Sequence, residues 1–245
     1  MRLPYSNTIT IKNNRALMTK KFIPFNKPIA QTPTEMLRRS AEFYEFLKAR
    51  RSIRDFSDKD VPQEIIDNCL RTAGTAPSGA NQQPWHFVII RDPSIKTKIR
   101  IAAEAEEKDF YAGRAGDTWL EALEPLGTNA DKPFLEKAPL LIAIFEQKFA
   151  IDAEGIKTKH YYAKESVGIA TGMLIAALHN VGLVTLTHTP SPMNFLTKLL
   201  NRPDGEKPFL LLVVGHPAEN VVVPDIYKKD LLDISSHFQA TEHDI

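Results

Sequence analysis

The sequence contains a single cysteine among its 245 residues, and this scarcity excludes several classes of protein. One cysteine can form neither an intramolecular disulfide nor a cysteine-based metal cluster. Cys69 falls on the apolar face of a helix predicted over residues 62–73, beside Ile66 and Ala73. We therefore expect Cys69 to be a small buried side chain and not a reactive thiol.

Long apolar runs and an excess of charge are also missing. No window approaches the roughly 20 apolar residues that a membrane span needs, and the N-terminus lacks the apolar segment of a signal peptide. Lysine and arginine number 31 against 30 aspartates and glutamates, so nothing in the net charge of +1 favours nucleic acid. We expect a cytoplasmic protein that binds neither a membrane nor nucleic acid.

Several common catalytic motifs are absent. The seven histidines contain no HxxxH or HxH pair, and His179 and His188 are too isolated to be favoured as metal ligands. The sequence has no GxSxG motif, no phosphate-binding P-loop and no GxGxxG motif. These absences argue against a metal site, a hydrolase of that type and a Rossmann dinucleotide site.

The length fits one domain with appendages. We expect an extended arm over residues 1–33, a main domain over residues 34–220 and an extension over residues 221–245. The hydrophobic patterns predict helices over residues 34–49, 62–73, 96–107, 160–181 and 192–200, strands over 85–90, 139–145, 182–187 and 208–215, and a polar loop over 148–158. Together they predict an α+β sandwich around a mixed sheet.

Two of the predicted helices carry further expectations. In the helix over residues 34–49, the apolar side chains that we expect to face the core are Met36, Leu37, Ala41, Tyr44 and Leu47. The helix over residues 160–181 is rich in glycine and alanine, which allow a neighbouring backbone to approach closely. That neighbour could be a second subunit, or the helix could simply be central in one chain.

An arginine-rich stretch, RRSIRDF over residues 50–56, follows the first predicted helix. Arginine suits phosphate because its planar guanidinium stays charged and donates several hydrogen bonds in a fixed geometry. Taken alone, the stretch could equally be a solvated basic corner. A second stretch, TAPSGANQQPW over residues 75–85, changes this balance.

The pair of stretches resembles the nitroreductase-fold flavoproteins that bind FMN. The resemblance implies an α+β, nitroreductase-like three-layer sandwich that forms an intertwined homodimer. It also implies that the flavin phosphate and ribityl chain are held by Arg50, Arg51, Ser52 and Arg54. The second stretch is expected to lie against the flavin across the dimer interface, through Pro77, Ser78, Gly79 and Asn81.

A third stretch, TLTHTP over residues 185–190, ends a predicted strand. Alternating threonines are ordinary in strands. Here, however, the stretch narrows the resemblance to the iodotyrosine deiodinase branch of the family, from about Arg38 to Ile234. The branch implies that Thr189 is the catalytic residue, donating a hydrogen bond to flavin N5. The further expected cofactor contacts are Thr187, His188 and a late cation, Lys228 or Lys229, in place of an arginine.

Residues 105–137 contain several glycines that interrupt helical periodicity, and such a segment often forms a lid. Glu107 and Tyr111 are spaced to share a helix face, which alone would suit a solvated helix. The resemblance implies instead that Glu107 binds the α-ammonium of the substrate, that Lys132 binds its α-carboxylate and that Tyr111 adds a hydrogen bond. It places the N–H of Ala80 against the phenolate oxygen.

The implied activity is FMN-dependent reductive dehalogenation of a halotyrosine, such as iodotyrosine, with an external electron donor that is unidentified. FMN supplies the redox chemistry and the protein supplies position and electrostatics. Two alternatives stay open on the sequence. The chain could be a general NAD(P)H-dependent nitroreductase or quinone reductase with an open site, or a protein that binds flavin or an amino acid without turnover.

Overall fold

A computed structural model describes residues 22–25 and 31–238, which divide into two units between Glu45 and Phe46. Most of the predicted N-terminal arm lies outside the described residues. Helix α1 (Pro33–Lys48) has no buried residue, and its Met36 and Tyr44 are exposed. The prediction that this helix faces the core is therefore wrong for the described residues, in which Leu37 and Ala41 are exposed as well and Leu47 is half-buried.

The second unit is built on a four-stranded sheet in the order β1–β2–β6–β5. The strands are β1 (Trp85–Ile90), β2 (Leu140–Gln147), β5 (Val184–His188) and β6 (Glu206–Gly215). Every neighbouring pair is antiparallel, so the prediction of a mixed sheet is wrong. Ser52 and Thr185 do form a parallel bridge, but it is isolated, because the arginine-rich stretch around Ser52 is too irregular to form a strand.

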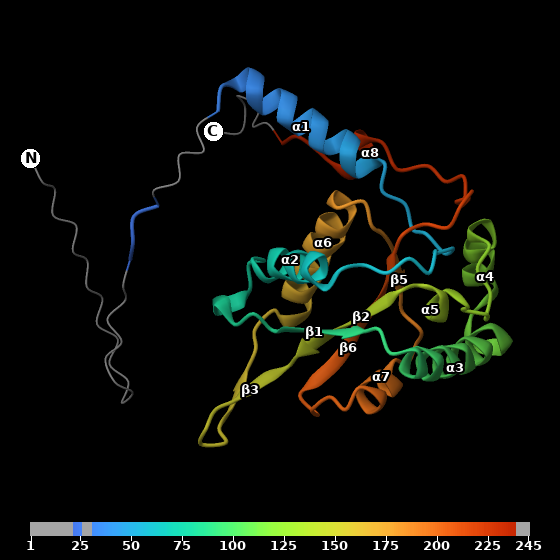
Figure 1. Cartoon of the computed structure of the whole chain (residues 1–245). Coiled ribbons are helices and arrows are strands. Elements are labelled where there is room, and N and C mark those ends of the chain that lie inside the picture. The colour runs from blue at the N-terminus through green and yellow to red at the C-terminus, as the bar shows by residue number, and fades with distance from the viewer. Residues whose placement is uncertain (1–21, 26–30, 239–245) are drawn as a thin grey trace, which may run out of the picture. The chain divides into compact units, whose positions relative to one another are not determined.

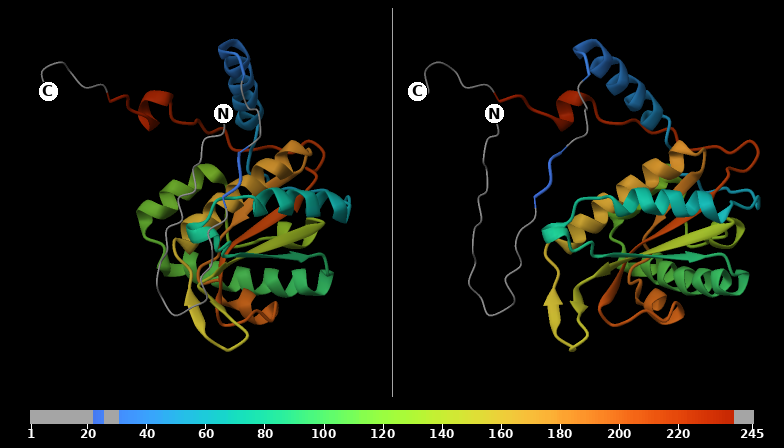
Figure 2. Two further views of the ribbon diagram at one scale, coloured as in Figure 1. Left: turned by 90° about the vertical axis from the view of Figure 1, so that its left-hand side faces the viewer. Right: turned by 60° about the vertical axis from the view of Figure 1, so that its left-hand side comes forward.

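Helices cover both faces of this sheet, as Figures 1 and 2 show. Side chains alternate along β2, so Leu140, Ile142 and Ile144 face one layer while Leu141 faces the other. The first layer contains α2 (Gln63–Gly74) and α6 (Ala163–Asn180), and the second contains α3 (Pro93–Asp109), α5 (Phe134–Lys137) and α7 (Asn194–Leu199). The main unit is thus a three-layer α+β sandwich.

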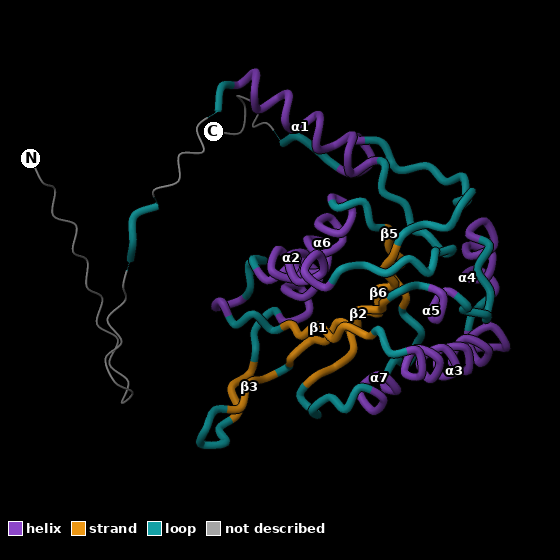
Figure 3. The backbone as a smooth tube through the Cα atoms, viewed as in Figure 1, coloured by secondary structure: helices purple, strands orange, loops and turns teal. Residues whose placement is uncertain are grey.

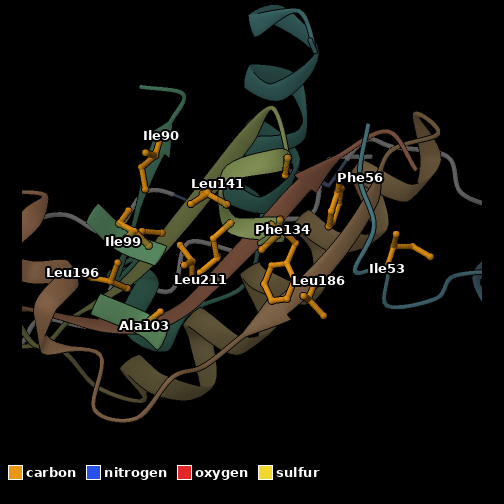
Figure 4. Packing of buried hydrophobic residues seen from close by; sticks show 14 of the residues in the cluster. Ile53, Phe56, Ile90, Ile99, Ala103, Phe134, Leu141, Leu186, Leu196 and Leu211 are labelled. Carbon is orange, nitrogen blue, oxygen red and sulfur yellow. The ribbon is translucent and has the colours of Figure 1, made fainter. Parts of the chain in front are cut away.

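The two cores consist of buried, mainly apolar side chains. Figure 4 shows part of the second core, where Ile99 and Ala103 of α3 lie with Leu141 and Leu211 of the sheet. The first core contains Cys69, which is 3% exposed, and burial raises the pKa of its thiol. The prediction that Cys69 is a buried small side chain is confirmed.

The segment predicted as a polar loop forms a hairpin of β3 (Phe149–Ile151) and β4 (Lys157–Lys159), visible in Figure 3. Its turn is stabilised because the carboxylate of Asp152 accepts a hydrogen bond from the N–H of Ile156 over 2.7 Å. Gly155 adopts the left-handed conformation there, with φ of +79°. Each strand is short and exposed, so no alternation of apolar residues indicated it.

The segment expected to form a pattern-poor lid is mostly helical. A π-helical turn (Phe110–Arg114) continues α3, and α4 (Asp117–Leu123) and a 3₁₀ turn (Glu124–Leu126) follow. The glycines lie at or near the ends of these pieces: Gly116 precedes α4, and Gly127 ends the 3₁₀ turn with φ of +59°. They divide the segment into short helices and do not abolish its helical structure. Near the C-terminus, α8 (Leu231–Ile234) is another short helix.

Candidate active site

A cavity of about 930 Å³ lies where the end of β5 meets the lid segment. Its walls combine residues that the sequence placed in three separate motifs. These are Arg54 from the arginine-rich stretch, Thr187, His188 and Thr189 from the end of β5, and Glu107, Tyr111 and Lys132 from the lid segment. The fold therefore brings together seven of the predicted site residues.

Strand β5 positions the threonines. Thr185 and Thr187 alternate along the strand, so their side chains lie on one side of it, and Thr189 directly follows its end. Thr185 is buried, whereas Thr187 and Thr189 are exposed at the cavity. The N–H of Ile53 donates to the carbonyl of Thr185 over 3.1 Å, beside the parallel bridge to Ser52. This pairing fixes the arginine-rich stretch along β5 and places Arg54 on the same cavity.

Lys132 and Glu107 form an ion pair in the wall of the cavity. The Lys132 ammonium lies 3.3 Å from the Glu107 carboxylate, with exposed fractions of 4% and 15% for the two side chains. The same ammonium donates to the carbonyl of Asn129 and lies 5.9 Å from the centre of the Tyr111 ring. The three residues predicted to recognise an amino acid are thus clustered, and the two opposite charges neutralise each other.

His188 is buried on the opposite side of β5 from the threonines. Its ring makes an edge contact with Phe134, with ring centres 5.6 Å apart. Burial, and secondarily the nearby charge of Lys132, lower the pKa of His188 to about 3. The imidazole is therefore neutral, and its Nε2 has no hydrogen-bond partner among the described residues.

The loop predicted to contact flavin lies outside this cavity. Ala80 and Asn81 adopt left-handed φ values of 50° and 54°, and no acceptor for the Ala80 N–H is found in the described part of the chain. Gly79 packs so closely on the segment before α6 that an added Cβ would lie 2.5 Å from the carbonyl oxygen of Tyr161. Gln82 tethers the loop further, because its side-chain oxygen accepts a hydrogen bond from the Tyr161 N–H over 2.8 Å.

The other predicted residues around the cofactor phosphate are only partly brought together. The Arg51 guanidinium donates to the carbonyl of Pro224, which holds the start of the C-terminal extension at the arginine-rich stretch. Lys228 and Lys229 follow a few residues later and are exposed. The residues that do not line the cavity are Arg50, Arg51, Ser52, Pro77, Ser78, Gly79, Ala80, Asn81, Lys228 and Lys229.

The cavity also has apolar walls that sequence reasoning missed. Trp119 of α4 contacts Phe110 edge to face, with ring centres 6.2 Å apart. Phe134, Met193 and Phe209 contribute further apolar surface. Phe110 and Trp119 could have been found, since two large aromatics stand in a segment that otherwise lacks a core pattern. Such walls are suited to an aromatic ligand.

Comparison with known proteins assigns this architecture. The sequence model of the Nitroreductase family matches residues 47–216. The chain belongs to the nitroreductase family. It is 56% identical over 198 residues to the iodotyrosine deiodinase of Haliscomenobacter hydrossis, covering 81% of this chain and 89% of that protein. It is 50% identical to iodotyrosine deiodinase 1 of Homo sapiens, covering 80% of this chain and 68% of that protein.

A crystal structure of a nitroreductase-family relative adds a ligand-bound example. Oxidised iodotyrosine deiodinase bound to FMN and 3-iodo-L-tyrosine superposes with a TM-score of 0.69 and 31% identity. The superposition covers 81% of this chain and all of that one. The nitroreductase fold predicted from the sequence is confirmed as an α+β fold with helices on both faces of an antiparallel sheet.

The residues at the cavity fit FMN chemically. Arg54 offers a guanidinium, which suits a phosphate or a polar ribityl chain, and Thr187 and Thr189 expose hydroxyls, which can donate and accept hydrogen bonds. The unpartnered Nε2 of His188 is a further buried polar atom that a bound group can satisfy.

Over residues 22–25 and 31–238, no helix combines the length and apolar content needed to cross a membrane. Nor does the described chain gather three or more His, Cys, Asp or Glu side chains in a group suited to a metal ion.

Proposed function

We propose that this nitroreductase-family protein is an FMN-dependent iodotyrosine deiodinase, which reductively removes iodide from iodotyrosine. Relatives named iodotyrosine deiodinase share 56% and 50% identity with it over most of the chain. The observation that carries the proposal is the Glu107–Lys132 ion pair, which lies beside Tyr111 on a cavity that Arg54 and Thr189 also line.

This ion pair suits a free amino acid. A zwitterion can add its ammonium to the Glu107 carboxylate and its carboxylate to the Lys132 ammonium, so that opposite charges alternate. The arrangement leaves no net charge in a wall where both side chains are largely buried. A ligand with one charge alone would leave an uncompensated ion there, which is costly. Tyr111 lines the same cavity, and in this proposal its hydroxyl donates one further hydrogen bond to the amino acid.

In this proposal the chain's own residues bind, orient and shield. Bound FMN supplies the two electrons of the reaction: with one proton, they convert iodotyrosine to tyrosine and iodide, as a C–H bond replaces the C–I bond. Arg54, Thr187 and Thr189 hold the cofactor, and Thr189 donates a hydrogen bond at flavin N5. Glu107, Lys132 and Tyr111 fix the amino-acid end, while Phe110 and Trp119 exclude water from the aromatic end.

We infer further that the active site is completed by a second copy of the chain. The family resemblance assigns the Ala80 N–H to the phenolate oxygen of the substrate, but Ala80 does not line the cavity of its own chain. Support comes from apolar side chains that one chain leaves exposed, among them Leu37 and Phe43 of α1, Ile169 of α6, and Tyr227, Leu232 and Phe238 of the extension. An intertwined homodimer would cover such surfaces and bring the loop to the partner's cavity.

The decisive test is anaerobic titration of the photoreduced, FMN-loaded protein with 3-iodotyrosine. We expect stoichiometric reoxidation of the flavin together with release of one iodide for each FMN. A protein that only binds the amino acid would leave the flavin reduced. A general nitroreductase would be reoxidised by nitroaromatic compounds or quinones but not by iodotyrosine. Light scattering of the same sample should give a dimer, and a flavin-loaded monomer would contradict the dimer proposal.

A further inference from the structure

Helix α3 carries a second charged cluster just before the residues that face the ligand. The Arg100 guanidinium donates to the Glu104 carboxylate over 2.8 Å, between residues spaced to share one helix face. Its Nε donates to the carboxylate of Glu136 in α5 over 2.6 Å, and this bond lowers the pKa of Glu136. Arg100 thus joins α3 to the helix that directly follows Lys132.

Glu104 links this cluster to Lys132 itself. While one carboxylate oxygen pairs with Arg100, the other accepts a hydrogen bond from the backbone N–H of Lys132 over 2.8 Å. The carbonyl of Lys132 accepts from the N–H of Leu135, where α5 begins. Since Glu107 pairs with the ammonium, one helix fixes both the backbone and the side chain of Lys132.

We propose that Arg100 and Glu104 are positioning residues that set where the Lys132 ammonium meets the substrate's α-carboxylate. The proposal rests on the proposed function and adds two residues to those that determine the specificity for the substrate. Neither residue is among those that line the cavity, so both act through Lys132 and not by touching the ligand. Holding a lysine ammonium in place costs side-chain conformational entropy. Because the backbone of Lys132 is already fixed before the substrate binds, part of this entropy cost does not have to be met on binding.

The test compares two substitutions of Glu104 in the FMN-loaded protein. Glu104→Leu removes the acceptor for the Lys132 N–H, whereas Glu104→Gln keeps an oxygen acceptor at similar length. We expect Leu to weaken 3-iodotyrosine binding by about tenfold and Gln by less than about threefold, since one hydrogen bond is at stake. Binding of 3-iodotyramine, which lacks the carboxylate, should change by less than about twofold in both variants.

Glu206→Leu is the matched control. Arg202 and Glu206 form an ion pair with the same spacing at 2.7 Å, Glu206 is 5% exposed, and neither residue lines the cavity. Loss of the Arg202–Glu206 ion pair should lower the stability of the fold without changing the preference for 3-iodotyrosine over 3-iodotyramine. If Glu104→Leu weakens both ligands equally, or behaves like Glu206→Leu, the positioning role is overturned.

Hydrogen exchange at the Lys132 amide separates this inference from the proposed function, because it needs no ligand. Exchange should be faster in Glu104→Leu than in the parent and near the parent rate in Glu104→Gln. If the parent fails to bind 3-iodotyrosine but this pattern is observed, the proposed function is wrong, whereas the hydrogen bond between Glu104 and the Lys132 backbone is supported. If the Lys132 amide exchanges at the same rate in Glu104→Leu and in the parent, Glu104 does not fix the Lys132 backbone and the positioning role is contradicted.

Discussion

The Lys132 ammonium and the Glu107 carboxylate lie 3.3 Å apart in the cavity wall, although they come from opposite ends of the lid segment. This pair predicts that Glu107→Gln and Lys132→Gln each weaken 3-iodotyrosine binding by about ten- to a hundredfold, because each removes a charge-assisted contact with the ligand. Tyr111→Phe should weaken it less, since it loses a neutral hydrogen bond. Titration of bound-flavin absorbance or fluorescence measures all three. FMN content should be unchanged, and parent-like affinity in both charge variants would contradict the proposed clamp.

Thr189→Ala should retain FMN and change the cofactor's redox behaviour. Loss of a hydrogen bond at N5 removes about 0.5–1.5 kcal/mol from whichever oxidation state it stabilises. Spectroelectrochemical titration with a halogen-free tyrosine ligand bound should therefore show a changed separation between the two one-electron potentials. Thr189→Ser, which keeps the hydroxyl, is the control and should stay close to the parent. Identical potentials for the alanine variant and the parent would remove Thr189 from this role.

Gly79→Ala should destabilise the fold by about 1–3 kcal/mol, because the added Cβ would lie 2.5 Å from the backbone carbonyl of Tyr161. Gly74→Ala is the matched control: no atom lies within 4 Å of its added Cβ, and we expect a neutral or slightly stabilising effect. Chemical denaturation of the two variants measures the difference. Equal stabilities would show that the loop can shift away from the Tyr161 carbonyl without cost.

His188 should make stability depend on pH below its ordinary pKa. Its folded-state pKa of about 3 lies below the ordinary 6.5, so the unfolded chain binds more protons between these values. The free energy of unfolding is therefore unaffected by the titration of His188 above pH 6.5. It decreases as the pH falls below that value, by about 2 kcal/mol at pH 5. His188→Leu should therefore lose less stability than the parent between pH 7.5 and pH 5. Parallel losses by chemical denaturation would rule out a buried neutral imidazole.

The sequence predicted the central strands and helices well because their apolar residues recur with a clear period or in unbroken runs. Strand β1 was predicted with its observed bounds, and β2 within two residues. The β3–β4 hairpin was missed because Phe149–Ile151 and Lys157–Lys159 bury almost nothing. The antiparallel order could not be read either, since apolar runs do not specify which strands pair.

The site shows a similar division. Glu107, Tyr111 and Lys132 were grouped by a family resemblance, and the structure brings all three to one cavity. Neither the Glu107–Lys132 pairing nor the contact of Glu104 with the Lys132 backbone could be foreseen. Both depend on how a loop returns to α3, and no local pattern records that path. The Ala80 loop stays a prediction, because its assigned role needs a second chain.

Strand β2 has a consequence for synthesis of the chain. Residues 140–145 are wholly buried on both faces, so before folding they form an uninterrupted apolar segment of the kind that aggregates. When this segment leaves the ribosome, β1, α2 and α3 have already emerged, whereas α6, α7 and β6 have not. One edge and part of each face can thus be covered at once, while the rest waits for residues 163–215. Slow translation or truncation within residues 163–215 leaves an incomplete sheet with exposed apolar surface that is prone to aggregate. We therefore expect the growing chain to depend most on chaperones while these residues are being added.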